Sequence, residues 1–260
     1  MSEQQQDHTS ETTDVEGHGG THAVAAATAH GQSVVWTLSG AHVFPVYDAA
    51  VGGRDTVAAA DGDTRRAERE GPLRLIDVRH EATAAFAAEA TGKLTRTPGF
   101  AVVTAGPGVT NTVSAITSAW FNGSPMVVLG GRSPAGRWGT GALQELDHPP
   151  LVAPVTKAAF TITDPAQAAP ELDRAFRLAG QPHRGPVFAD IPMDVLFSHG
   201  SASAPTGAHD ERPSVDDDAV ARIARLLAEA ERPVLVLGGD VWADGADTVA
   251  WMRQQPWYTG

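Results

Sequence analysis

A carboxyl side chain stands at a strand-to-helix boundary, where it could exchange a proton with a bound ligand. Glu81 follows the apolar segment Leu73 to Val78 and precedes the alanine-rich run Ala82 to Ala88. An acid in the first turn of a helix can serve only to complement the helix dipole. A carboxyl in a partly apolar groove can instead trade a proton with a ligand. Position alone leaves both interpretations of Glu81 open.

A glycine-containing turn follows the next apolar segment, Phe100 to Thr104. Gly106 to Asn111 reads Gly-Pro-Gly-Val-Thr-Asn and joins that segment to a helix-like one. Glycine permits unusual backbone dihedrals and lets a ligand approach the main chain. The turn does not match the Gly-x-Gly-x-x-Gly fingerprint of dinucleotide-binding domains. It is not a P-loop either, because the Gly-Lys-Ser/Thr element of that motif is missing. By itself it is a weak indication of a ligand site, and a simple tight turn is the alternative.

A polar run, Gln144 to His148, lies in an irregular segment and is compatible with an ordinary surface loop. The sequence predicts no metal site. Residues 240–247 faintly resemble a calcium loop, but Trp242 falls where an oxygen ligand is needed. The N-terminal histidines lack the spacing of metal ligands; they are His8, His18, His22 and His30.

Apolar, strand-like segments alternate with helix-like segments along most of the chain. This alternation predicts the α/β class, with a doubly wound parallel sheet covered by helices on both faces. Ligands of such sheets bind at the carboxyl ends of the strands, where Glu81 and the Gly106 turn are expected. We expect strands at 34–38, 73–78, 100–104, 126–129, 187–191 and 234–237, and helices at 42–50, 81–94, 109–121, 164–179 and 216–230.

Composition suggests how these elements are divided. Residues 1–20 are expected to be a disordered tail and residues 21–198 one α/β domain. A linker rich in Ser, Ala, Pro and Gly is expected over residues 199–215, and residues 216–260 would begin a second α/β domain. The polar stretch Gly52 to Gly71 is expected to be an exposed, inserted loop.

Charge and residue usage exclude several classes of protein. The 260 residues carry a formal net charge of -12, which argues against nucleic acid and membrane partners. There is no cysteine, so disulfides, thiolate metal sites and a cysteine nucleophile are excluded. The polar segment Met1 to Asp14 is unlike a secretory signal, and no apolar run is long enough to span a bilayer. A cytoplasmic protein is expected.

Four segments together resemble thiamine-diphosphate enzymes of the acetolactate synthase large-subunit type. Each is modest alone, but four in the same order and spacing are specific, and the likeness covers roughly residues 21 to 200. Oxalyl-CoA decarboxylase and 2-hydroxyacyl-CoA lyase are similar but less close. The segments are Arg79-His80-Glu81, Gly106 to Asn111, Gln144 to Asp147, and Gly185 to Asp194.

The resemblance implies a fold, an activity and roles for individual residues. Residues 21–198 would be the pyrimidine-binding domain of an enzyme that decarboxylates a 2-keto acid and joins carbon units, in branched-chain amino acid biosynthesis. Glu81 would hydrogen-bond to pyrimidine N1′ and so favour the imino tautomer, which takes the thiazolium C2 proton. Gly40, Pro107 and Asn111 would line the pyrimidine, and Gln144 would lie near the substrate.

Three departures from acetolactate synthases leave FAD binding, and acetolactate synthesis itself, open. Met193 stands where many of them have a lysine that reaches the flavin or substrate region. His183 stands where they have an arginine that contacts FAD, although Arg184 is adjacent. Gly40-Ala41-His42 replaces a more glycine-rich turn.

Length is the largest departure. Family members are considerably longer and hold Mg²⁺ and the diphosphate in a C-terminal domain, at a Gly-Asp-Gly…Asn motif that this sequence lacks. We therefore expect an incomplete chain that is inactive alone. It would form a homodimer or tetramer, or pair with a complementary diphosphate-binding chain.

Two other classes of function are alternatives to an enzyme of this family. A truncated, non-catalytic homologue would act as an interaction module. An unrelated dinucleotide-binding domain would require a glycine-rich fingerprint after the first strand, which Ser39 to His42 does not supply.

Overall fold

Six parallel strands form the central sheet, in the spatial order β3-β2-β4-β5-β7-β6. The structure is a computed structural model that describes residues 14–52, 71–208, 214–245, 250 and 253–254. The predicted doubly wound α/β fold is confirmed. The strands are β2 (Val34–Thr37), β3 (Arg74–Asp77), β4 (Gly99–Val103), β5 (Met126–Arg132), β6 (Ala158–Thr161) and β7 (Pro186–Pro192).

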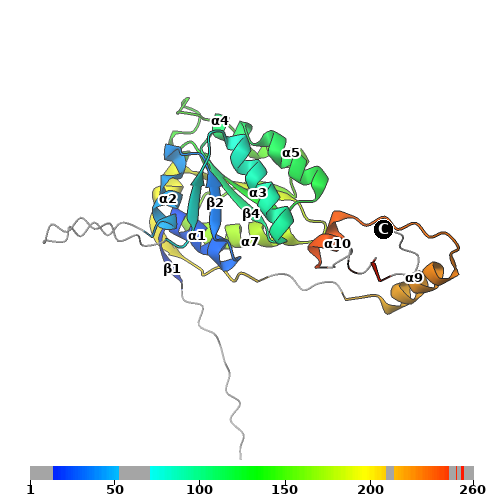
Figure 1. Ribbon diagram of the computed structural model, residues 1–260. Coiled ribbons are helices and arrows are strands. Elements are labelled where there is room, and N and C mark those ends of the chain that lie inside the picture. The colour runs from blue at the N-terminus through cyan, green and yellow to red at the C-terminus, as the bar shows by residue number, and fades with distance from the viewer. Residues whose placement is uncertain (1–13, 53–70, 209–213, 246–249, 251–252, 255–260) are drawn as a thin grey trace, which may run out of the picture.

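Alternate side chains of the central strands enter two separate cores, one on each face of the sheet. In β4, Phe100 and Val102 pack with helices α1 (Gly19–Ala29), α2 (Phe44–Ala50) and α7 (Ala168–Gly180). Ala101 and Val103 point the other way, into the core beneath α3 (Glu81–Thr95) and α5 (Val113–Asn122). Figure 1 shows α3 and α5 side by side on this second face. Burial on both faces explains why these strands are apolar throughout.

Short helical segments connect the larger elements. The helix expected over residues 109–121 is interrupted, and α4 and α5 take its place. The helix expected over residues 164–179 begins as a 3₁₀ turn, which Asp164 caps by accepting a hydrogen bond from the Ala166 amide. The short segments are α4 (Pro107–Thr110), α6 (Pro149–Val152), α8 (Met193–Phe197), α10 (Gly239–Ala243), η1 (Ala41–Val43), η2 (Ala135–Arg137), η3 (Ala153–Val155) and η4 (Pro165–Gln167).

The expected disordered tail over residues 1–20 is wrong for its last residues. Strand β1 (Val15–His18) pairs antiparallel with β8 (His199–Ala202), and α1 begins directly afterwards at Gly19. β8 in turn occupies the start of the expected linker. The two strands are distant in the sequence, so no local pattern could show their pairing. Residues 1–13 lie outside the described residues.

The strand expected at 234–237 is also wrong. These residues are not in a strand, and Val234 and Val236 are almost fully exposed. A strand exists only through hydrogen bonds to a neighbouring strand, and among the described residues none lies beside this segment. The preceding helix α9 (Asp217–Glu229) forms as expected and lies apart from the sheet (Figure 1). The division into domains stays a prediction, and the expected loop at 52–71 lies almost wholly outside the described residues.

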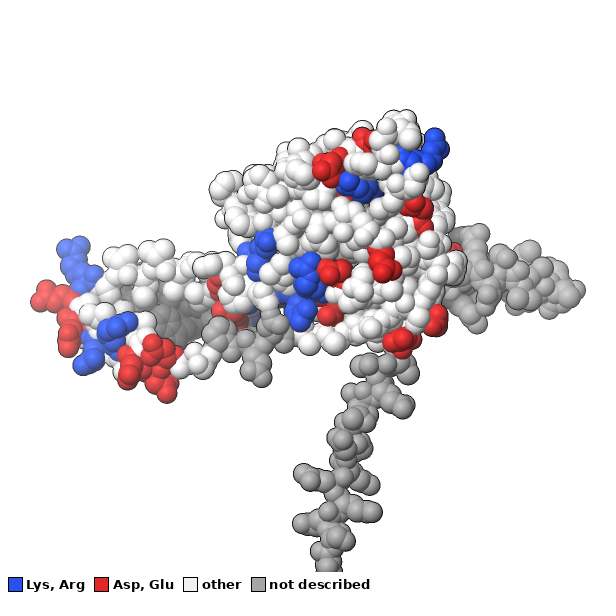
Figure 2. Space-filling view, turned by 180° about the vertical axis from the view of Figure 1, so that it is seen from behind, with Lys and Arg blue, Asp and Glu red and all other residues white. Residues whose placement is uncertain are grey.

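The surface mixes both signs of charge. Figure 2 shows acidic and basic side chains interspersed over one face of the molecule, between wide uncharged areas. Within the ranges that the structure describes, no helix is long and apolar enough to cross a membrane.

Two glycines allow α3 to lie close to the sheet. A Cβ on Gly99 in β4 would collide with the backbone carbonyl of Ala88 in α3. A Cβ on Gly92 in α3 would collide with the backbone carbonyl of Pro125, just before β5. Because Glu81 is the first residue of α3, this close packing sets the position of its carboxyl group above the sheet.

We predict that Gly99→Ala lowers the free energy of unfolding by about 1–3 kcal/mol, because α3 must move away from β4. Urea denaturation of the purified chain measures this change. Gly200→Ala is the matched control, since a Cβ at Gly200 meets no atom within 4 Å. Equal denaturation midpoints for the two variants would contradict the proposed packing constraint.

Candidate functional site

The chain reverses its direction across the sheet between β2 and β4. From β2 it continues to β3 on one side and then returns to β4 on the other. In parallel sheets such a switch point leaves a crevice outside the carboxyl ends of the two strands. Gly40 follows β2 and Gly106 follows β4, so both turns lie beside this crevice.

The Glu81 carboxyl group faces the Gly106 turn rather than solvent. The residue is 9% exposed, and Asn111 Nδ2 donates a hydrogen bond of 2.9 Å to Glu81 Oε2. Glu81 Oε1 lies 3.8 Å from the place that a Cβ on Gly108 would take. No residue that the structure describes donates a hydrogen bond to Oε1, so this oxygen can accept one from a ligand.

Glycines let the turns after β2 and β4 pack closely against Thr104. A Cβ on Gly40 would collide with the Thr104 side chain, and a Cβ on Gly108 would lie 2.7 Å from its Cγ2 atom. The main chains of both turns therefore approach Thr104 closely. Pro107 starts α4 and is exposed, so its ring can pack against a ligand in the crevice.

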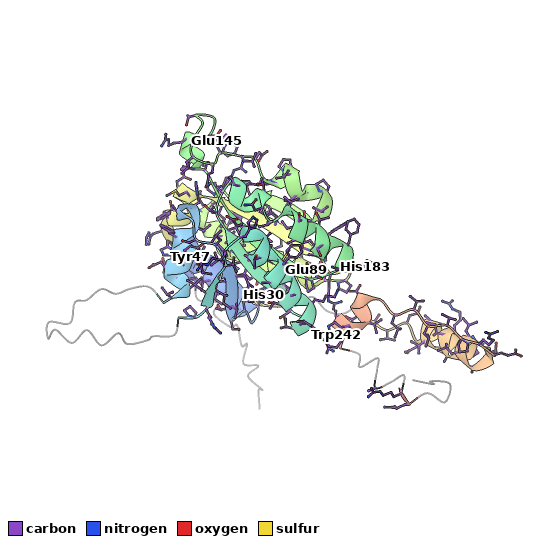
Figure 3. The ribbon with its side chains drawn as sticks, turned by 45° about the horizontal axis from the view of Figure 1, so that its top comes forward. His30, Tyr47, Glu89, Glu145, His183 and Trp242 are labelled. Atoms are coloured by element: carbon purple, nitrogen blue, oxygen red, sulfur yellow. The ribbon has the colours of Figure 1, made fainter. Side chains whose placement is uncertain are left out.

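Gln144 is brought to the same edge of the sheet. Its backbone has a left-handed φ of 59°, and a Cβ on Gly106 would lie 2.9 Å from the Cβ of Gln144. The loop around it is held by Glu145, whose carboxylate accepts hydrogen bonds from the amides of Gly139 and Ala142. Figure 3 shows Glu145 far from His183 and Trp242, on the opposite side of the sheet domain. The five predicted site residues thus lie near the carboxyl ends of β2 and β4: Gly40, Glu81, Pro107, Asn111 and Gln144.

Sequence reasoning did not assign His42 to the site. His42 is buried, and its Nδ1 lies 3.0 Å from Thr104 Oγ1, beneath the Gly40 turn. Burial lowers the pKa of His42, and nearby His148 lowers it further, although a hydrogen bond with the Leu143 backbone opposes the change. His42 is therefore neutral at neutral pH. Its place directly after β2 is the only signal in the sequence that could have indicated it.

Met193 and His183, two of the three departures from acetolactate synthases, lie at opposite edges of the sheet. Met193 follows β7 at the carboxyl edge, where the crevice lies. His183 precedes β7 at the other edge, and its Nδ1 lies 3.1 Å from Asp240 Oδ2 in α10. The neighbouring Arg184 donates hydrogen bonds to Asp240 and Asp244. Both basic side chains thus interact with the segment around α10.

The parallel sheet and its switch point define an α/β domain in which a buried carboxyl group meets a glycine turn, at the place where such sheets bind ligands. Residues 18–151 match the family described as thiamine pyrophosphate enzyme, N-terminal TPP binding domain. The chain belongs to this family, which confirms the resemblance found in its sequence.

Curated relatives agree with this assignment. The acetolactate synthase large subunit IlvG of Mycobacterium tuberculosis is 45% identical over 228 residues, which are 86% of this chain and 38% of that protein. A probable acetolactate synthase of Mycobacterium bovis has the same identity and coverage. The 2-hydroxyacyl-CoA lyase 2 of Danio rerio is 32% identical over 257 residues, covering 85% of this chain. The chain spans 38% of the length of each of these three relatives.

The lowered pKa of His42 predicts a pH dependence of stability. In the unfolded chain this histidine titrates near about 6.5 and binds a proton more readily than in the folded state. Its contribution to stability is therefore present above pH about 6.5 and is lost as the pH falls through the lowered folded-state pKa.

The test compares urea unfolding of the wild type and His42→Asn between pH about 5 and 7, the range in which histidine titrates. We expect the free energy of unfolding to depend less steeply on pH in the variant. Identical slopes for both proteins would show that His42 is not linked to folding.

Proposed function

We propose that the crevice binds the aminopyrimidine of thiamine diphosphate in an enzyme that decarboxylates a 2-keto acid and joins carbon units, as acetolactate synthase does. One observation carries this proposal: the buried Glu81 carboxyl faces the turn that starts at Gly106, with Oε2 held by Asn111 and Oε1 receiving no hydrogen bond from a described residue. The ring nitrogen of an aminopyrimidine bound beside this turn would form a hydrogen bond with Glu81 Oε1. The 45% identity to a relative named acetolactate synthase supports the reaction class.

The chain's own residues have defined tasks in this proposal. Thiamine diphosphate, when bound, supplies the electron sink that accepts the electrons released by decarboxylation. Glu81 holds a proton at pyrimidine N1′, and Asn111 keeps the carboxyl group oriented. Gly40 and Pro107 bound the ring, and their small or apolar surfaces exclude water. Gln144, from the loop beside Gly106, contacts the substrate.

The diphosphate needs a second binding site. Among the described residues, no group of three or more His, Asp or Glu side chains could hold a metal ion. The sequence has no Gly-Asp-Gly motif. We propose that Mg²⁺ and the diphosphate are held by another domain or another chain. For FAD, the basic residues at the expected position, His183 and Arg184, interact with Asp240.

Large apolar side chains on the helices beside the crevice support association with a second subunit. Phe86 on α3 and Trp120 and Phe121 on α5 are substantially exposed, and Phe121 is 81% exposed. Exposed apolar side chains grouped on one face are typical of protein interfaces. We propose a homodimer or tetramer, or a complex with a complementary diphosphate-binding chain, through this face.

The second candidate function is a 2-hydroxyacyl-CoA lyase, which the 32% identity to the relative of that name favours. In both candidate functions Glu81 shares a proton with pyrimidine N1′. The two functions differ in the substrate that would lie beside Gln144. Assays of the complete enzyme with a 2-keto acid and with a 2-hydroxyacyl-CoA would separate them.

We predict that Glu81→Gln slows exchange of the thiamine C2 proton by about 10²–10⁴-fold, the usual contribution of a positioned acid–base group. Glutamine keeps the size of the side chain but has no proton to share with N1′. Proton NMR in deuterated buffer measures the exchange in the assembly of this chain with its diphosphate-binding part. Exposed Glu229→Gln is the control, and an unchanged rate in Glu81→Gln would refute the role of the carboxyl group.

We also predict that these 260 residues alone do not bind thiamine diphosphate tightly in the presence of Mg²⁺. They offer contacts for the pyrimidine but no site for the diphosphate. Isothermal titration calorimetry measures the affinity. A dissociation constant of about 1 μM, equivalent to about 8 kcal/mol of binding energy, would contradict the proposed division of the site.

A further inference from the structure

A fully buried histidine contacts the glycine turn from inside the protein. The Gly106 amide donates a hydrogen bond of 2.9 Å to His148 Nε2, and His148 Nδ1 lies 2.7 Å from Asp190 Oδ2. A backbone amide can only donate, so Nε2 must be the unprotonated nitrogen. Nδ1 then carries the proton and donates to Asp190. The two contacts together select one tautomer of the ring.

Asp190 is itself held by neighbouring strands. It lies in β7 and is fully buried. Arg132, at the end of β5, donates a hydrogen bond of 3.0 Å to its Oδ2, and Thr161, at the end of β6, donates one of 2.6 Å to its Oδ1. The carboxylate that orients His148 is therefore fixed by the carboxyl ends of three adjacent strands.

The same network reaches the loop that carries Gln144. Arg132 also donates a hydrogen bond of 2.9 Å to Asp147, the residue before His148. Its guanidinium group lies 4.0 Å from the centre of the Trp138 ring. Both ends of the 133–148 loop are thus tied to the carboxyl edge of the sheet, next to the Gly106 turn.

We propose that His148 is a positioning residue for the cofactor site, which acts by holding the Gly106 amide and thereby the turn from Pro107 to Asn111. This inference rests on the proposed function of the crevice. Gly106 has φ of 57°, a left-handed conformation, and the hydrogen bond from its amide fixes the turn at that point. Because Asn111 belongs to the same turn, the orientation of the Glu81 carboxyl group depends on it. Packing alone, such as the edge contact of His148 with Phe188, would not require an acceptor at Nε2.

Two substitutions distinguish the roles of the two ring nitrogens of His148. In His148→Gln the amide oxygen can take the place of Nε2 and accept from Gly106. In His148→Asn the amide nitrogen can take the place of Nδ1, and Gly106 loses its acceptor. His199→Asn, at an exposed histidine in β8, is the control.

The first measurement is NMR of the isotope-labelled 260-residue chain. Ring ¹⁵N shifts should show the Nδ1-protonated tautomer in the wild type. Hydrogen exchange of the Gly106 amide should accelerate by about tenfold or more in His148→Asn, because a buried donor is left unpaired. It should stay near the wild-type rate in His148→Gln and in the control. An Nε2-protonated ring, or unchanged exchange in His148→Asn, would overturn the inference.

The second measurement uses thiamine at millimolar concentration as the probe and follows the amide shifts of the Gly106 turn. The wild type, His148→Gln and the control should show saturable shift changes, and His148→Asn should require at least about tenfold more thiamine. Equal binding by wild type and His148→Asn would refute the role of His148 while leaving the proposed function intact. Absence of any response in the wild type would instead refute the proposed function. Urea midpoints confirm that each variant is folded.

Discussion

The hydrogen bond from Asn111 to Glu81 is the interaction on which the rest of the site depends. It joins the start of α3 to the end of α4 across the carboxyl edge of the sheet, and it leaves one carboxylate oxygen for a ligand. Hydrogen bonds to a charged group contribute about 1.5–3 kcal/mol when buried. The contact can form only if α3 lies close to β4 and if the Gly106 turn keeps its left-handed dihedral.

A layer of buried polar groups beneath the turn maintains this geometry. His148, Asp190, Arg132 and Thr161 link the carboxyl ends of β5, β6 and β7. Burying an ion pair such as Arg132 with Asp190 recovers little net stability, because desolvation offsets much of the attraction. Removing one partner is costly, however, since the other charge is left unpaired. Such a network therefore specifies one arrangement of the edge rather than adding to the overall stability.

The described residues from 214 onward behave differently from the sheet domain. α9 has an apolar stripe, yet Ile223 and Leu226 remain exposed, as do Val234 and Val236 beyond it. Helix α9 forms because its hydrogen bonds are internal, whereas the expected strand lacks a neighbour with which to pair. Helix α10 is anchored to the sheet domain, where Trp242 donates a hydrogen bond to the Lys93 carbonyl and stacks with Arg96.

The sequence by itself determined the α/β class, five of the six strands of the sheet and the segments that carry the site, since apolar runs and turn residues are local signals. It also singled out Glu81 and the Gly106 turn, because strand ends are where such sheets bind ligands. Only the tertiary structure decided that Asn111 holds Glu81, that β1 pairs with β8, and that His42 and His148 lie beneath the turns. Those facts depend on contacts between residues far apart in the chain, which spacing within one segment cannot reveal.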